Sequence, residues 1–210
     1  CKNPDFNSRY LGHNQGKPMI IMAFLPQNNI NLISKATKNI LIKNNVVPNL
    51  EIVMINSKEC GSNSKKVIED GRNKAELNGK DGVLVLSGRQ CSLGVSIHDC
   101  DVVLMLNNNF GFDMIYQMMF RCMNEGENKK AGFVVDLNLH RVIETDIIDY
   151  GSIIKPGSHP KDAAKYILQE QLINLNGDHW IPSFGHSQSS VSEISNSIYE
   201  IYSSNTEKAL

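Results

Sequence analysis

Short, mostly apolar runs alternate with amphipathic segments over the first two thirds of this chain, and this alternation restricts the folds that it can adopt. Each run is five or six residues long, which suits a strand that is buried on both faces. We expect strands at residues 19–24, 51–55, 82–86, 102–106 and 132–137. Between these runs, apolar residues recur at helical spacing, and we expect helices at residues 31–44, 64–78 and 113–124. This order predicts an α/β fold in which helices cover both faces of a mostly parallel sheet.

Local signals set the bounds of several expected helices. Ser64 can cap the second of the three helices, and Gly79 suits its C-terminal end. Pro160 is favourable at a first helical position and predicts a further helix at 160–174. The first of the three helices should pack against the sheet through one apolar stripe. This stripe is formed by Leu32, Ile33, Ala36, Ile40 and Leu41.

Composition divides the chain into three parts. Residues 1–17 are polar and predict a linker or arm, and residues 18–150 contain the expected sheet. Residues 151–210 are richer in Ser, Pro, Gly and His, and predict a C-terminal helical extension with a second helix at 189–202. Because the chain begins with Cys1 and not with Met, we expect it to be a fragment of a longer polypeptide.

Bulk composition narrows the class of protein. The net charge is −1 over 210 residues, which is less basic than is usual for a dedicated nucleic-acid-binding domain. No apolar run approaches the ~20 residues that cross a bilayer, so we expect no membrane partner. The five cysteines include no CxxC pair, which favours an intracellular, reducing compartment. The six histidines show no paired ligand spacing, so we expect no metal site.

Parallel strands direct their carboxyl ends, and the loops that follow them, to one edge of a sheet, where ligands commonly bind. The polar residues expected at this edge are Pro26-Gln27, Ser57-Lys58, Ser87-Gly88-Arg89 and Asn107. A phosphate-binding loop of the GxxxxGK[ST] type would follow a strand and open a helix. Gly16-Lys17-Pro18 and Gly79-Lys80-Asp81 both fail this test.

The expected helix at 113–124 has a broad apolar face, which is formed by Met114, Ile115, Met118, Met119, Cys122 and Met123. Its other side has a polar stripe at intervals of four, four and three residues, formed by Asp113, Gln117, Arg121 and Asn124. The planar guanidinium of Arg121 suits phosphate oxygens. An exposed helix arginine that pairs with Asp113 or Glu125 is the alternative interpretation.

Two motifs in residues 81–136 resemble the second RecA-like domain of superfamily-two helicases. The segment from Ser87 to Asp101 is similar to the family motif A-T-D-x-x-x-R-G-L/I-D-I-P-x-V-D, and Gly94, Ile97, Asp99 and Asp101 fall on corresponding positions. The helix is similar to Q/H-R-x-G-R-x-G-R, with matches at Gln117 and Arg121. The sequence departs from the family at Leu93 and Ser96 in the loop, and at Phe120 and Asn124 in the helix.

The resemblance implies a split ATP site. Arg121 and Gln117 would be the catalytic residues, and the positions of Gly94, Ser96 and Asn124 would contact the nucleotide. ATP and Mg²⁺ would be held mainly by the N-terminal RecA-like domain of the same polypeptide. The residues that would grip the phosphate backbone of single-stranded or duplex nucleic acid are Ser87, Gly88, Arg89, Gln27, Ser57 and Lys58.

The divergent motifs and abundant asparagine resemble the helicases of large DNA viruses, which adds the viral transcription machinery as a partner and the host cytoplasm or virion as a location. Two alternatives remain open. A degenerate motor domain would act as a nucleic-acid or protein scaffold, as Ser96 and Asn124 indicate. An unrelated small-molecule enzyme could use the same type of sheet, because such folds host many chemistries. The glycine-containing loop would then be an ordinary turn.

Overall fold

A computed structural model describes residues 17–56, 63–88, 97, 99–108, 111–124, 129, 131–171, 173–174, 181–182 and 188–207. The chain folds into two units, with the boundary between Leu137 and Asn138. This boundary precedes the one predicted at residue 150. The reason is that Ile147 and Ile148, which the sequence assigned to the sheet domain, are buried in the core of the second unit.

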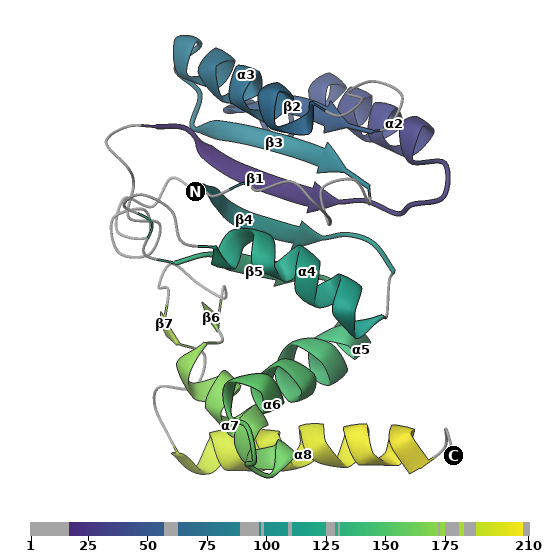
Figure 1. Cartoon of the computed structure of the whole chain (residues 1–210), viewed down its shortest axis with the longest axis vertical. Helices are drawn as coiled ribbons and strands as arrows, with labels where there is room; N and C mark the ends of the chain where they lie inside the picture. Colours follow the sequence, from purple (N-terminus) through teal and green to yellow (C-terminus); the bar gives the residue numbers. More distant parts are fainter. Residues whose placement is uncertain are drawn as a thin grey trace. The chain divides into compact units, whose positions relative to one another are not determined.

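The first unit contains a parallel sheet of five strands among the described residues, in the order β2-β3-β1-β4-β5 (Figure 1). The strands are β1 (Met19–Phe24), β2 (Leu50–Ile55), β3 (Gly82–Ser87), β4 (Cys100–Met105) and β5 (Phe133–Asp136). Its helices are α2 (Ile30–Lys43), α3 (Ser64–Leu77) and α4 (Phe112–Met123). The predicted α/β class is therefore confirmed, and each strand lies within two residues of its predicted bounds.

Helices cover both faces of the sheet. On one face, Leu84 and Leu86 of β3 pack in a cluster with Ile33 of α2. On the other face, Gly71 of α3 lies so close to Val53 and Val83 that an added Cβ atom would stand 2.6 Å from a methyl group of Val53. Alternate residues of β3 therefore pack against two different helices, which explains why this strand is buried throughout.

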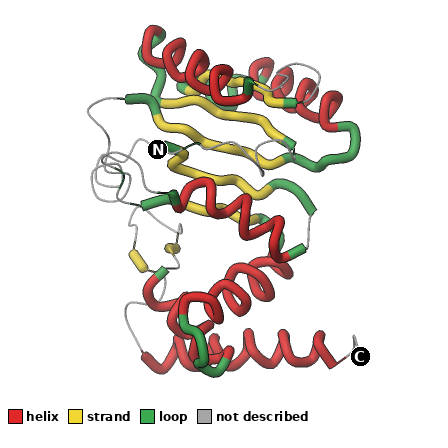
Figure 2. The backbone as a smooth tube through the Cα atoms, in the orientation of Figure 1, coloured by secondary structure: helices red, strands yellow, loops and turns green. Residues whose placement is uncertain are grey.

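The order of the strands accounts for the sides on which the helices lie. The connection from β1 to β2 crosses the sheet in one direction, and the connection from β2 to β3 returns in the other. Right-handed crossovers therefore place α2 and α3 on opposite faces. The connection from β4 to β5 runs in the same direction as that from β2 to β3, and Figure 2 shows α4 on the same side of the sheet as α3.

The ends of α3 correct one prediction and confirm another. Asn63 is the N-cap residue and makes no side-chain cap hydrogen bond, so Ser64 is the first helical residue and not the cap. Gly79 has a φ of 62°, and its N–H donates to the carbonyl of Glu76 at 3.0 Å. This left-handed residue ends the helix as expected, because glycine adopts that conformation without a Cβ clash.

The apolar stripe predicted on α2 is only partly correct. Ile33 and Leu41 pack against the sheet, whereas Leu32, Ala36 and Ile40 are exposed. The buried face is instead centred on Ser34, whose hydroxyl donates to the carbonyl of Asn31 at 3.3 Å. A local hydrogen bond therefore allows a serine to occupy a position where the sequence pattern predicted an aliphatic side chain.

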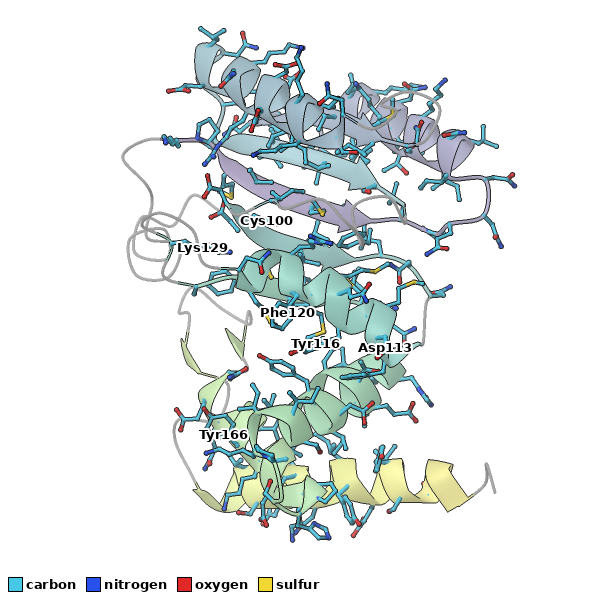
Figure 3. All side chains as sticks on the ribbon, viewed as in Figure 1. Cys100, Asp113, Tyr116, Phe120, Lys129 and Tyr166 are labelled. Atoms are coloured by element: carbon cyan, nitrogen blue, oxygen red, sulfur yellow. The ribbon has the colours of Figure 1, made fainter. Side chains whose placement is uncertain are left out.

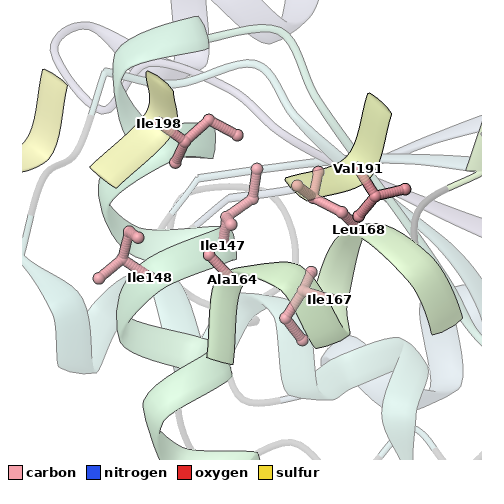
Figure 4. Packing of buried hydrophobic residues seen from close by; sticks show 7 residues of the cluster. All are labelled: Ile147, Ile148, Ala164, Ile167, Leu168, Val191 and Ile198. Atoms are coloured by element: carbon pink, nitrogen blue, oxygen red, sulfur yellow. The ribbon is translucent and has the colours of Figure 1, made fainter. Parts of the chain in front are cut away.

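The second unit is largely helical and has its own hydrophobic core. Its elements are α5 (Leu139–Arg141), the π-helix η2 (Val142–Asp149), α6 (Tyr150–Ile154), α7 (Pro160–Glu170), β6 (Ile173–Asn174), β7 (Ile181–Pro182) and α8 (Gln188–Glu207). Figure 4 shows the buried residues of this core, which come from η2, α7 and α8. Pro160 is in the first turn of α7, as predicted, and the ring of His159 accepts from the N–H of Lys161.

Candidate functional site

The carboxyl edge of the sheet gathers residues that are far apart in the sequence. Phe24 of β1 is paired with Ser87 of β3 on one side and with Met105 of β4 on the other, so these three strands end at the same level. Gly88 follows β3 directly, and Gln27 and Asn107 lie three and two residues beyond the ends of β1 and β4. The sequence predicted a binding edge here, and the parallel arrangement of the strands places these residues on one side of the sheet.

Ser87 is completely buried at the end of β3. Its hydroxyl donates to the carbonyl of Gly88 at 3.4 Å, and its own carbonyl accepts from the N–H of Leu25 at 2.8 Å. Both polar groups of Ser87 are thus used inside the protein. The buried hydroxyl is therefore not accessible to a phosphate in this conformation.

Gly88 is fixed by packing against the start of α2. A Cβ atom at this position would stand 2.8 Å from Cγ1 of Ile30 and 3.2 Å from its Cδ1. Such a separation is shorter than ordinary van der Waals contact between carbon atoms. The glycine therefore lets the end of β3 pass close to α2, and this is a structural reason for its presence at the edge.

Two side-chain amides connect the edge to α4. Nε2 of Gln27, which is half-buried, lies 3.6 Å from Sδ of Met114. Nδ2 of Asn107, which is buried, lies 3.4 Å from Sδ of Met118. The two methionines are one helical turn apart, so the loops after β1 and β4 contact successive turns of the same helix.

The outer surface of α4 carries the predicted polar stripe. Ile115, Met118, Met119 and Cys122 are buried against the sheet. Asp113 and Gln117 are exposed on the other side, and Arg121 is half-buried one turn beyond Gln117. The prediction that these three polar residues share one side of the helix therefore agrees with their exposure.

Asn124, the last member of the stripe, is the C-cap residue of α4 and not part of the helix. Its backbone has extended dihedral angles, with φ −63° and ψ 141°. Its carbonyl accepts from Nζ of Lys129 at 2.9 Å. A cation thus stands beside the end of α4, where a lysine interacts favourably with the helix dipole.

A row of aromatic side chains lies beside this stripe, and the sequence analysis did not identify it. The rings of Phe112 and Tyr116 are stacked with 5.6 Å between their centroids, and those of Tyr116 and Phe120 lie at 4.7 Å. Figure 3 shows Tyr116 and Phe120 along α4. The repeat of aromatic residues every four positions is visible in the sequence and could have revealed the row.

Two acidic residues in the motif segment, Asp99 at an unrestricted position and Asp101 at the last one, have structural partners near the amino ends of the strands. Asp99 forms an ion pair with Arg72 at 3.1 Å. Asp101 is buried, and its Oδ2 accepts from the backbone N–H of Ile20 at 2.8 Å. The pairing of β1 with β4 shifts its register between Ile20 and Ile21, so the carboxylate supplies the acceptor that the ladder lacks there.

Five of the predicted site residues lie outside the described residues: Ser57, Lys58, Arg89, Gly94 and Ser96. Ile97, which also matches the loop motif, is buried. The described part of the site therefore consists of the edge at Gln27, Ser87 and Gly88, together with the outer surface of α4.

Comparison with known proteins assigns no family. No protein-family model matches this chain, and no curated protein matches its sequence. Within the described residues, no group of three or more His, Cys, Asp or Glu side chains could hold a metal ion. None of the helices in that part of the chain has both the length and the apolar character that crossing a bilayer requires.

Proposed function

We propose that this chain is the C-terminal motor domain of an ATP-dependent nucleic-acid helicase or translocase. The observation that carries the proposal is the position of Gln117 and Arg121 on the outer side of α4. This helix connects β4 to β5 in an all-parallel sheet, and the resemblance to superfamily-two helicases assigns these two residues to the ATP site.

The two side chains suit contact with a nucleotide that another domain holds. Gln117 presents an amide to solvent, and Arg121 is only partly accessible. An arginine in a partly water-excluded position stabilises charge on phosphate oxygens more strongly than one in bulk solvent. ATP would supply the phosphoryl group, while Mg²⁺ and most nucleotide contacts would come from the N-terminal RecA-like domain.

The carboxyl edge of the sheet supports a role in nucleic-acid binding. Gln27, in the loop between β1 and α2, is half-buried, and its side-chain amide contacts Met114 of α4. Amide contacts to backbone phosphates hold a strand without reading its sequence. In this proposal Gln27 acts with Gly88 and with residues of the neighbouring loops, and single-stranded or duplex nucleic acid is the partner.

Replacement of Arg121 in the full-length polypeptide tests the proposal. We expect Arg121→Ala to reduce strand-stimulated ATP hydrolysis by about a thousandfold or more, as loss of an arginine finger does. Circular dichroism should show an unchanged fold. Lys65→Ala is the matched control, because Lys65 is an exposed cation that pairs only weakly with Glu69 at 3.9 Å. Turnover close to that of the wild type in Arg121→Ala would refute the role of Arg121.

A degenerate motor domain that serves as a scaffold is the second candidate. The observation that favours it is the end of α4 at Asn124, which falls on the last arginine of the family motif. At that helix end the ammonium of Lys129 is bonded to the carbonyl of Asn124, and Arg121 lies in the last turn of the helix. If Asn124→Arg created ATP turnover in an inactive full-length protein, the scaffold would be supported. Brisk hydrolysis by the wild type would exclude it.

A further inference from the structure

Phe120 differs from the other aromatic side chains that the structure describes, because it is the most exposed of them. It is 40% exposed, whereas the others are buried or half-buried. A single exposed apolar side chain is common on protein surfaces, so its neighbours decide whether it has a role. Phe120 precedes Arg121 and lies one helical turn beyond Gln117, and these are the two residues assigned above to the ATP site.

The aromatic row holds the ring of Phe120. Its centroid lies 4.7 Å from that of Tyr116, with 52° between the two ring planes. Tyr116 is in turn stacked on Phe112, at 5.6 Å and 22°. Both Tyr116 and Phe120 are labelled on α4 in Figure 3. A ring that is packed in this way has little rotational freedom left, so a ligand that contacts it loses less affinity to side-chain ordering.

The side chains on the outer side of α4 follow a defined order around the helix axis. Successive residues of an α-helix are about 100° apart, so Gln117 lies about 60° beyond Phe120 around the axis and Arg121 about 40° beyond Gln117. The buried residues Ile115 and Cys122 are on the opposite side. An aromatic ring, an amide and a guanidinium therefore follow one another across this surface.

This order matches the order of chemical groups in a nucleoside triphosphate. The base has a π-face that stacks on an aromatic ring. The ribose has hydroxyl groups, which a side-chain amide can bind through either its N–H or its carbonyl oxygen. The phosphate oxygens suit a planar guanidinium. One ribose separates the base from the phosphates, as Gln117 separates Phe120 from Arg121.

We propose that Phe120 stacks on the base of the nucleoside triphosphate whose phosphates Arg121 contacts. The inference rests on the proposed function, because it takes ATP as the ligand of the outer side of α4. Phe120 falls on a glycine of the helicase motif, so the resemblance itself supplies no stacking residue here. The ring binds the base and touches none of the reacting atoms, so it should act on substrate affinity and not on the chemical step.

Steady-state ATP hydrolysis by the full-length polypeptide tests the stacking. Phe120→Ala should raise KM for ATP by about five- to 150-fold, the range that base–aromatic stacking covers, and leave kcat unchanged. Phe120→Trp should keep KM near that of the wild type, because an aromatic ring remains. Leu77→Ala is the matched control and should change neither constant, since Leu77 is an apolar side chain of α3 that is 87% exposed.

Phe120→Leu separates stacking from simple apolar contact, because leucine is apolar and has no π-face. It should raise KM nearly as much as Phe120→Ala, and a wild-type KM in Phe120→Leu would overturn the stacking. An unchanged KM in Phe120→Ala, or a fall in kcat alone, would also overturn it, while the measured ATP hydrolysis would keep the motor function. Absence of both ATP binding and hydrolysis in the wild type would overturn both proposals.

The triphosphate of 2-aminopurine riboside gives a direct readout, because the emission of this base is quenched when it stacks. The wild type and Phe120→Trp should quench the bound probe, and Phe120→Ala should not. Equal emission of the probe bound to the wild type and to Phe120→Ala would refute the stacking. If the wild type quenches the probe but hydrolyses no ATP, the motor function fails and the stacking stands.

A nucleic-acid base is the other ligand that could stack on this ring. The affinity for a fluorescein-labelled oligonucleotide, measured without ATP, should be the same for Phe120→Ala and the wild type. A weaker affinity for the oligonucleotide beside an unchanged KM for ATP would assign Phe120 to the strand and overturn the inference.

Discussion

Arg72 of α3 joins two segments that precede strands of the sheet. Its Nε donates to the carbonyl of Pro18 at 2.8 Å, and its Nη1 lies 3.1 Å from Oδ2 of Asp99. Pro18 precedes β1 and Asp99 precedes β4, so one guanidinium holds the starts of two neighbouring strands. The ion pair with Arg72 gives Asp99 a structural reason for its position, where the helicase loop motif allows any residue.

We expect Arg72→Ala to lower the free energy of unfolding by about 1–3 kcal/mol, the cost of leaving partly buried hydrogen-bond partners unsatisfied. The side chain of Arg72 is 15% exposed and that of Asp99 is 40% exposed, so most of the loss should come from the carbonyl of Pro18. Asp99→Asn should therefore cost less than Arg72→Ala in urea titrations. A larger cost for Asp99→Asn would show that the ion pair dominates.

The lowered pKa of the Glu51 carboxyl group predicts a loss of stability in acid. Burial raises the pKa of its carboxyl group, but hydrogen bonds from Lys74 and Lys80 outweigh burial and lower the pKa below its ordinary value of 4.5. The nitrogen-to-oxygen distances are 2.6 Å and 2.7 Å. A lowered folded-state pKa contributes stability above the unfolded-state pKa, and this contribution disappears as the pH falls through the folded-state pKa.

Glu51→Gln should therefore lower the free energy of unfolding at pH 7 and reduce its decline below pH 4.5. Urea titrations at a series of pH values measure both effects. Glu69→Gln is a suitable control, because the side chain of Glu69 is 60% exposed. An unchanged acid dependence in Glu51→Gln would contradict the assigned cause of the lowered pKa.

Substitution of Gly88 can show whether close packing against Ile30 or backbone freedom requires glycine at this position. Gly88→Ala should lower the free energy of unfolding by about 1–3 kcal/mol, because the new methyl group overpacks the site against Ile30. Ile30→Ala removes both atoms that the methyl group would meet, at 2.8 Å and 3.2 Å. The double variant should therefore be more stable than the sum of the single effects predicts. Simple additivity would instead indicate that backbone freedom, and not contact with Ile30, requires glycine here.

Most secondary-structure elements of the sheet unit could be predicted from the sequence, because continuous apolar runs and helical periodicity are strong local signals. The segment 139–154 could not. Val142, Ile143, Thr145, Ile147 and Ile148 are β-branched and favour strands by local propensity. They are helical because Ile147 and Ile148 are buried among residues of α7 and α8, which is tertiary packing that no local pattern reports.

The candidate site was predictable to a similar extent. The polar stripe on α4 follows from the spacing of Gln117 and Arg121. The inward hydroxyl of Ser87 and the contact between Gln27 and Met114 could not be predicted, because they depend on how β1, β3 and α4 pack together. Asp101 shows the same limit, since its role at the register shift requires knowledge of the partner strand.

Truncation of Leu168 tests whether the core that Figure 4 shows stabilises the helical unit. This side chain is 1% exposed and belongs to the cluster of Ile147, Ile167 and Val191. Leu168→Ala should cost about 2–5 kcal/mol, as truncation of a buried leucine does. Hydrogen exchange followed by mass spectrometry should become faster in α7 and α8. Ile153→Ala, at a position that is 46% exposed, should have little effect.

Cys122 predicts that alkali destabilises the sheet unit. Burial raises the pKa of the Cys122 thiol from 9.0 to about 12, and the pKa of the buried Cys100 thiol is also raised by burial. A raised folded-state pKa means that the stabilising contribution is complete below pH 9 and is lost as the pH rises toward 12. Cys122→Ala should therefore reduce the decline in the free energy of unfolding above pH 9.

Because the thiolate is the reactive form, neither thiol should be alkylated at pH 8 until the protein unfolds. Peptide mapping after iodoacetamide treatment measures this, and rapid labelling of Cys122 in the folded protein would contradict its burial.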